Sequence, residues 1–219
     1  MPVKRSYAEH GDACATAHGM ELIGEKWTHP ILRELMLGPK RFGELEASVR
    51  GITPAVLSAR LRELEASGLV RRVTLPPPAR ATAYDLTPWA RELRPIFRTL
   101  AHWAHRSPTW HPESGGLTPD GIVESMLTMA PPVALDPPVV LALRLRDDRE
   151  PAAETYDYRL TWGDALDITR SPAPDAAATV TGDSTTWTGV LYSGVALAAM
   201  TVTGDAAEVQ RLVAAFAPA

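Results

Sequence analysis

Hydrophobic positions in the first half of the chain recur every three to four residues, the spacing of amphipathic helices. Four helices are predicted, at about 13–24, 28–37, 41–51 and 54–68. The fourth begins after Thr53, a favourable N-cap, with Pro54 at the first helical position, where a missing backbone N–H costs nothing. We expect it to bury Val56, Leu57, Leu61 and Leu64. The sequence thus predicts a cluster of short helices before residue 69.

From residue 69 the period falls to two, which is typical of strands. Segments 69–75 and 81–87 flank the proline-rich stretch 76–80, so a hairpin with a stiff loop is expected. One further helix is predicted from Thr87 and Pro88 to about residue 103. Its apolar positions are Trp89, Leu93, Ile96, Phe97, Leu100 and Trp103. A lone flanking helix cannot bury all six, so they are predicted to form a dimer interface on a winged helix-turn-helix.

The second half predicts a different architecture. Helices are expected at 118–130, 184–192 and after Asp205, and strands at 139–146, 155–162, 164–170, 177–182 and 199–204. This order indicates an α+β fold with a five-stranded, mostly antiparallel sheet. A stretch rich in Pro, Gly and Ser separates the halves. We therefore predict domains at 1–106 and 118–219, joined by a linker at 107–117.

The charge is distributed unevenly between these halves. Residues 1–106 hold 16 Lys and Arg against 11 Asp and Glu, whereas residues 107–219 hold 6 against 15. The overall net charge of −4 therefore hides a basic first half, and only that half has the sign to approach a polyanion. Hydrophobic residues make up 45% of the chain, which excludes a wholly disordered protein.

Candidate chemistry is sparse. The second half has one histidine, His111, and neither cysteine nor lysine, and its aspartates fall mostly at turns and helix caps. No phosphate-binding loop or metal-ligand spacing is present, so no enzyme activity, cofactor or metal is predicted. A membrane span needs about 18–20 apolar residues, and no such run or secretory signal occurs. With Cys14 as the single cysteine, a reducing cytoplasm is expected.

The fourth helix and the hairpin define a predicted DNA-facing surface. With the leucines turned inward, small and polar residues of the helix face outward, and its start is directed at base edges in a major groove. Basic residues before the third helix and on the hairpin suit phosphates or a minor groove. The predicted DNA-binding residues are Lys40, Arg41, Thr53, Pro54, Ala55, Ser58, Ala59, Arg62, Arg71, Arg72 and Arg80. The competing interpretation is a solvated helix face with pairs such as Arg60 and Glu63.

Several segments resemble the HxlR-type winged-helix regulators. They are LIGEKW (22–27), ILREL (31–35), GPKRFGEL (38–45), LSARLRELE (57–65) and YDLTPWAREL (84–93), in a likeness covering residues 7–106. The resemblance implies a dimeric bacterial transcriptional regulator. In such a dimer the terminal helices pair two protomers, and the two recognition helices enter successive major grooves of a pseudo-palindromic operator.

The second half is similar to the sterol-carrier-protein fold over residues 118–218. The similarity lies in LDITR (166–170), ATVTGD (178–183), WTGVLYSG (187–194) and VTGD (202–205). It implies an apolar tunnel for lipid-like molecules. The candidate lining residues are Met126, Met129, Trp162, Trp187, Leu191, Tyr192 and Met200. For each of them, ordinary core packing is the competing interpretation.

Three hypotheses follow. The leading one is a dimeric DNA-binding regulator whose second domain binds a small apolar effector. The second keeps the DNA-binding role and makes Cys14 a sensor of oxidants or electrophiles, as in some HxlR-type proteins; its competing interpretation is a half-buried hydrophobe. The third is a lipid carrier or small-molecule enzyme whose winged helix mediates protein contacts only. DNA binding that strengthens as salt falls would argue against the third.

Overall fold

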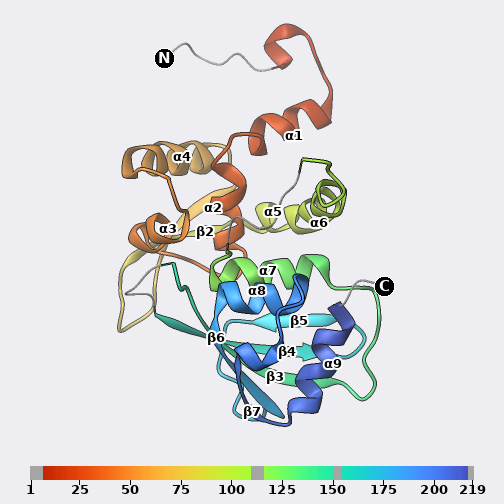
Figure 1. Cartoon of the computed structure of the whole chain (residues 1–219). Coiled ribbons are helices and arrows are strands. Elements are labelled where there is room, and N and C mark those ends of the chain that lie inside the picture. Colours follow the sequence, from red (N-terminus) through yellow and green to blue (C-terminus); the bar gives the residue numbers. More distant parts are fainter. Residues whose placement is uncertain (1–6, 110–115, 150–153, 217–219) are drawn as a thin grey trace. The chain divides into compact units, whose positions relative to one another are not determined.

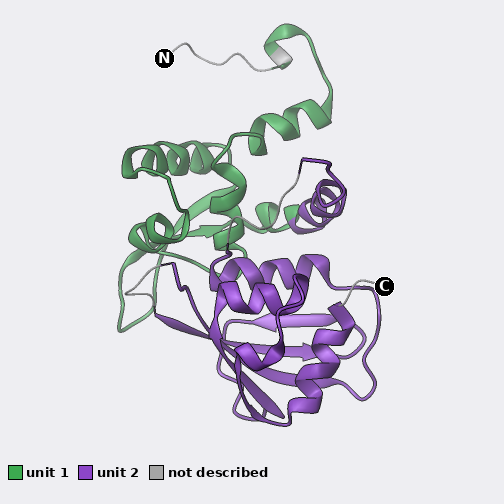
Figure 2. Cartoon of the chain, viewed as in Figure 1, with its two compact units in different colours: residues 1–93 green, residues 94–219 purple. Residues whose placement is uncertain are grey.

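The computed structural model of the protein describes residues 7–109, 116–149 and 154–216. The chain divides into two compact units, unit 1 at residues 1–93 and unit 2 at residues 94–219 (Figure 2). Unit 1 ends earlier than the winged-helix domain expected from the sequence. The helix that follows residue 93 groups with unit 2 instead. Residues 110–115 of the expected linker lie outside the described residues.

Unit 1 has the element order of a winged helix-turn-helix. It contains a short 3-10 helix η1 (Ala8–His10), α1 (Ala15–Ile23), α2 (Thr28–Leu35), α3 (Phe42–Ser48), α4 (Pro54–Ala66), β1 (Val70–Thr74), β2 (Thr82–Leu86) and α5 (Pro88–Arg91) (Figure 1). The two strands pair antiparallel, with Val70 opposite Leu86 and Thr74 opposite Thr82. The predicted helices and hairpin are present.

The interior of unit 1 follows the helical period, with two corrections. Ile31, Leu35, Leu57 and Leu61 are fully buried. Val56 was expected inside but is 39% exposed, because the inward stripe of α4 runs through positions 57, 61 and 64. Helix α1 was expected to bury an apolar face, but none of its residues is buried.

The helix predicted after Thr87 is two helices. Thr87 caps α5, with Ala90 N–H donating to its Oγ1 at 3.2 Å, and α6 (Leu93–Ala104) follows after Glu92. Pro95 explains the break, because it has no N–H to donate to the carbonyl four residues earlier and is tolerated only in the first turn of a new helix. The six residues predicted to form the dimer interface also differ from one another in exposure. Trp89, Ile96, Leu100 and Trp103 are exposed, Leu93 is half-buried and Phe97 is buried.

Unit 2 has an α+β fold, in which helices pack against one five-stranded sheet. Besides α6 it contains α7 (Pro119–Met129), β3 (Val139–Arg146), β4 (Thr155–Trp162), β5 (Leu166–Thr169), β6 (Ala178–Asp183), α8 (Ser184–Tyr192), η3 (Leu197–Ala199), β7 (Thr201–Gly204) and α9 (Ala206–Phe216). Alternate residues of β3 and β4 are buried, and α7, α8 and α9 all contact the sheet (Figure 1). The predicted helices and five strands are present, each within a few residues of the expected place.

The sheet corrects one expectation. Its strand order is β5-β4-β3-β6-β7, and the sheet is mixed, not mostly antiparallel as predicted. The chain returns across the sheet after β5, so β6 lies beside β3 and runs parallel to it, with Leu141 opposite Ala178. The neighbouring pairs β3–β4, β4–β5 and β6–β7 are antiparallel.

The predicted effector-pocket residues pack against one another or against core neighbours. Met126, Trp162 and Trp187 are fully buried, and the Trp187 indole N–H donates to Met126 Sδ at 3.4 Å. The Trp162 ring meets Phe216 edge-on with centroids 5.3 Å apart. Leu191 and Met200 are also buried, Met129 is half-buried, and Tyr192 is 38% exposed. These are the contacts of a packed interior, so the apolar tunnel stays a prediction from the resemblance.

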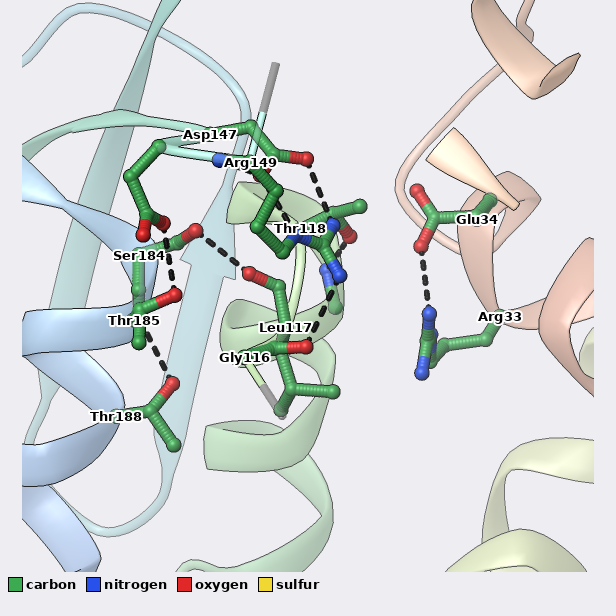
Figure 3. A network of polar contacts seen from close by, with 12 residues as sticks. Arg33, Glu34, Gly116, Leu117, Thr118, Asp147, Arg149, Ser184, Thr185 and Thr188 are labelled. Carbon is green, nitrogen blue, oxygen red and sulfur yellow. Dashed lines mark hydrogen bonds and ion pairs between the residues drawn. The ribbon is translucent and has the colours of Figure 1, made fainter. Parts of the chain in front are cut away.

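A polar network fixes the entry of the chain into α7 (Figure 3). Arg149 makes two bonds of 2.7 Å to the Asp147 carboxylate and a third, of 2.9 Å, to the Gly116 carbonyl. The Ser184 hydroxyl donates to the Leu117 carbonyl at 2.6 Å. Thr118 then caps α7, accepting from Gly121 N–H at 2.8 Å. The start of α7 is thereby tied to the end of β3 and to the start of α8.

Candidate nucleic-acid interface

The start of α4 presents an open surface. Thr53 caps the helix, and its Oγ1 accepts from Val56 N–H at 3.4 Å. Pro54, Ala55 and Ser58 are exposed, while Ala59 is half-buried. Small side chains at a helix N-terminus let the backbone approach a ligand closely, and the free N–H groups there favour an anion. The predicted recognition surface is therefore accessible in the folded domain.

Two predicted DNA-binding arginines are exposed and have no acidic partner within the described ranges. Arg62 lies one turn after Ser58 on α4, and its Nε donates only to the Ser58 carbonyl, at 3.3 Å. Arg80 lies in the hairpin loop with φ of +37°. Positive charge that is not neutralised by the protein is available to phosphates or base edges.

The other exposed arginines of the predicted surface are paired. Arg41 contacts Glu44 at 3.1 Å, Arg71 contacts Asp85 at 3.1 Å, and Arg72 contacts Glu65 at 2.9 Å. Hydrogen bonding and charge attraction from Glu65 raise the pKa of Arg72. The pairs of Arg41 and Arg72 contribute little stability, because their carboxylates are partly exposed, so exchange of the carboxylate for a phosphate costs little. The Asp85 carboxylate is buried, but it keeps Arg91 as a partner when Arg71 contacts a phosphate.

Lys40 does not lie on the surface. Its side chain is 5% exposed, and Nζ donates to Glu34 Oε2 at 2.6 Å. The backbone of Lys40 pairs with Tyr84 of β2, through N–O distances of 3.0 and 2.8 Å, and this bridge holds the residue inside unit 1. The expectation that Lys40 contacts phosphate is therefore corrected, and we leave it out of the interface.

Comparison with known proteins identifies the fold of this region. A family model described as HxlR-like helix-turn-helix matches residues 22–111. The HTH-type transcriptional regulator YkvN of Bacillus subtilis is 40% identical over 91 residues, 42% of this chain and 77% of that protein. The chain belongs to the HxlR-like helix-turn-helix family.

Two further similarities were found. The HTH-type transcriptional regulator sll1512 of Synechocystis is 35% identical over 88 residues, 40% of this chain and 65% of that protein. A solved structure of the reduced form of the regulator YodB from B. subtilis is 31% identical, covers 45% of this chain and 97% of that one, and has a TM-score of 0.41. The predicted role as a DNA-binding transcriptional regulator is confirmed by membership of the HxlR-like family, whereas the sterol-carrier-like identity of residues 118–218 stays a prediction.

The structure of this HxlR-like protein adds residues that the sequence analysis did not assign to the DNA-facing surface. Arg50, between α3 and α4, is exposed, and Val56 presents an apolar side chain beside the start of α4. At the base of the hairpin, the buried Asp85 carboxylate accepts from Arg91 at 2.6 Å as well as from Arg71. Arg91 also donates to the Met36 carbonyl at 3.0 Å, so this cluster joins the hairpin to α2 and α5.

Cys14 is exposed and occupies the N-cap position of α1. The backbone N–H groups of Ala17 and Thr16, at the start of the helix, lower the pKa of its thiol. The structure thus departs from the interpretation of Cys14 as a half-buried hydrophobe. His18, which flanks it in sequence, contacts Glu21 at 3.4 Å.

The described ranges contain no group of three or more His, Cys, Asp or Glu placed to hold a metal ion. Within the same ranges, no helix has both the length and the apolar character needed to cross a membrane.

Proposed function

We propose that this HxlR-like regulator binds a pseudo-palindromic operator as a homodimer, with α4 of each protomer in a major groove and the hairpin beside it. The observation that carries the proposal is the open start of α4, followed one turn later by the unneutralised Arg62. In this arrangement Ser58 and Arg62 contact bases, while Arg80 reaches the backbone or a minor groove. Arg41, Arg71 and Arg72 exchange their carboxylate partners for phosphates.

The proposed dimer surface is the outer face of α6, and its occupant is a second copy of this chain. An open apolar surface on this helix is formed by Pro95, Ile96, Thr99, Leu100 and Trp103. Ile96 is 53% exposed and Trp103 is 66% exposed, which is unusual for such large apolar side chains on a solvated helix. Membership of a family of dimeric regulators supports self-association as the reason. A small apolar effector bound by unit 2 stays a prediction, because its expected lining residues are packed.

Removing either free arginine is expected to weaken DNA binding in a distinct way. Arg62→Ala should lower the affinity for a duplex selected by the full-length protein about 5- to 100-fold and relax sequence preference, because a base contact is lost. Arg80→Ala should lower the affinity for selected and random duplexes by the same factor. It should also reduce the slope of log affinity against log salt by about one. Fluorescence anisotropy over a range of salt concentrations measures both quantities.

Arg144→Ala is the control, because Arg144 is also an exposed arginine but lies on β3 of unit 2, where it pairs with Asp157. It should leave the affinity and the salt slope unchanged. If Arg62→Ala and Arg80→Ala behave like this control at moderate salt, then the assigned face is not the one that reads DNA.

A second candidate function is regulation through Cys14, favoured by its exposure and the lowered pKa of its thiol. A thiolate at a helix N-terminus reacts readily with electrophiles. We expect N-ethylmaleimide to alkylate the native protein at Cys14 and to lower its DNA affinity several-fold, while Cys14→Ser retains full affinity with or without the reagent. Unchanged affinity of the fully alkylated protein, checked by mass spectrometry, would show that Cys14 is not a sensor.

A further inference from the structure

Helix α6 has two chemically different sides. At about 100° per residue, Ile96, Leu100 and Trp103 lie on one side and Arg94 and Arg98 on the opposite side. The first side is the open apolar surface assigned above to the dimer. The second side is held by α7 of the same compact unit. One helix therefore carries the proposed dimer surface on one side and an attachment to α7 on the other.

That attachment consists of two arginine contacts. Arg94 forms a bidentate pair with Glu124, with Nε to Oε1 at 2.9 Å and Nη2 to Oε2 at 3.0 Å. The Glu124 side chain is only 9% exposed, so water competes little for it. One turn later, Arg98 Nη2 donates to the carbonyl of Ala130, the C-cap of α7, at 2.9 Å. Two planar bonds and a cation at a helix C-terminus fix orientation as well as distance.

Helix α7 is in turn fixed to the body of unit 2. Asp120, four residues before Glu124, accepts from the Tyr158 hydroxyl of β4 and from Arg170, both at 2.6 Å. Burial and the Asp120 carboxylate raise the pKa of Tyr158, so its hydroxyl keeps the proton that it donates. Met126 of α7 contacts the Trp187 indole of α8. A shift of the sheet or of α8 therefore has to move α7.

We propose that the Arg94–Glu124 pair is the joint through which α7 and the rest of unit 2 position α6 for pairing with a second protomer, with Glu124 as a positioning residue. The inference rests on the proposed α6 dimer. In this arrangement α7 fixes the orientation of α6 from the side that faces away from the partner. Unit 2 therefore sets the dimer affinity directly. A change in unit 2 reaches the DNA-reading helices through α6, without any ligand at the winged helix.

The test measures the monomer–dimer equilibrium of the full-length chain by sedimentation equilibrium. Arg94→Met and Glu124→Gln are each expected to raise the dimer dissociation constant about tenfold, because α6 loses its fixed orientation. The exchange variant Arg94→Glu with Glu124→Arg should return it to within about threefold of the original value. Arg144→Met is the control: Arg144 pairs with Asp157 at 2.8 Å on the sheet and contacts neither α6 nor α7 in the described structure.

Amide hydrogen exchange separates positioning from loss of fold. In Arg94→Met, exchange across residues 93–104 should accelerate while β3 and β4 keep their protection. Arg94→Met leaves the buried Glu124 carboxylate without this arginine, whereas Glu124→Gln leaves no buried charge and a partly exposed Arg94, so Glu124→Gln tests the orientation of α6 even if Arg94→Met does not fold. An unchanged dissociation constant in Arg94→Met, together with dissociation by Leu100→Glu, overturns the joint but leaves the dimer surface intact. A monomeric native protein, or a dimer that survives Leu100→Glu, overturns the proposed dimer surface and the joint with it.

Discussion

Leu100→Glu is expected to convert the protein into a monomer with little loss of folded stability. Leu100 is 45% exposed in the single chain, so the new carboxylate is solvated there. In the proposed dimer the same carboxylate enters an apolar contact without a partner, which costs several kcal/mol, on the order of 100-fold or more in the dissociation constant. Sedimentation equilibrium measures the association, and thermal unfolding measures the stability.

The same substitution should lower affinity for the selected duplex by about 100-fold or more, because a monomer loses the second half-site held at high effective concentration. Val133→Glu is the matched control, since Val133 is also 45% exposed and lies in unit 2 outside α6. If the Leu100→Glu protein still sediments as a dimer, the interface lies elsewhere. The exposed Met20 of α1 would then be the next residue to test.

Local period and capping chemistry predict most of the fold. The fourth helix was expected after Thr53 and is α4 (Pro54–Ala66), because its cap, its proline and its leucine spacing all lie within one segment. The strands of unit 2 alternate clearly enough to be placed in the same way. The parallel β3–β6 pair was missed, because the order of strands in a sheet depends on long-range packing that local alternation does not contain.

The candidate site shows the same limit. Arg62 lies within a predicted helix and Lys40 just before another, and sequence alone assigned both cations to DNA. Their difference comes from a long-range bridge, in which the Lys40 backbone pairs with Tyr84. The break before α6 has a local cause in the sequence, Pro95. In contrast, nothing near Arg94 in the sequence indicates that its partner is Glu124, 30 residues away.

The buried pair of Glu34 and Lys40 predicts the largest loss of stability in unit 1. Glu34 is fully buried and contacts Arg33 at 3.0 Å as well as Lys40 at 2.6 Å. Glu34→Ala takes this carboxylate away from the buried Lys40 ammonium, which costs about 3–5 kcal/mol. A domain is stable by only about 5–15 kcal/mol, so urea denaturation should show a large fall in the midpoint for unit 1.

Glu63→Ala is the control for this loss, because Glu63 is 62% exposed in its pair with Arg60 and its removal should cost about 0.5 kcal/mol or less. The decisive comparison is Glu34→Met combined with Lys40→Met, which removes both charges and fills the space with flexible apolar chains. If the cost of Glu34→Ala comes from the stranded ammonium, this double variant recovers at least half of the lost stability. A double variant as unstable as Glu34→Ala would mean instead that the carboxylate supports its neighbours, Arg33 among them, rather than compensating Lys40.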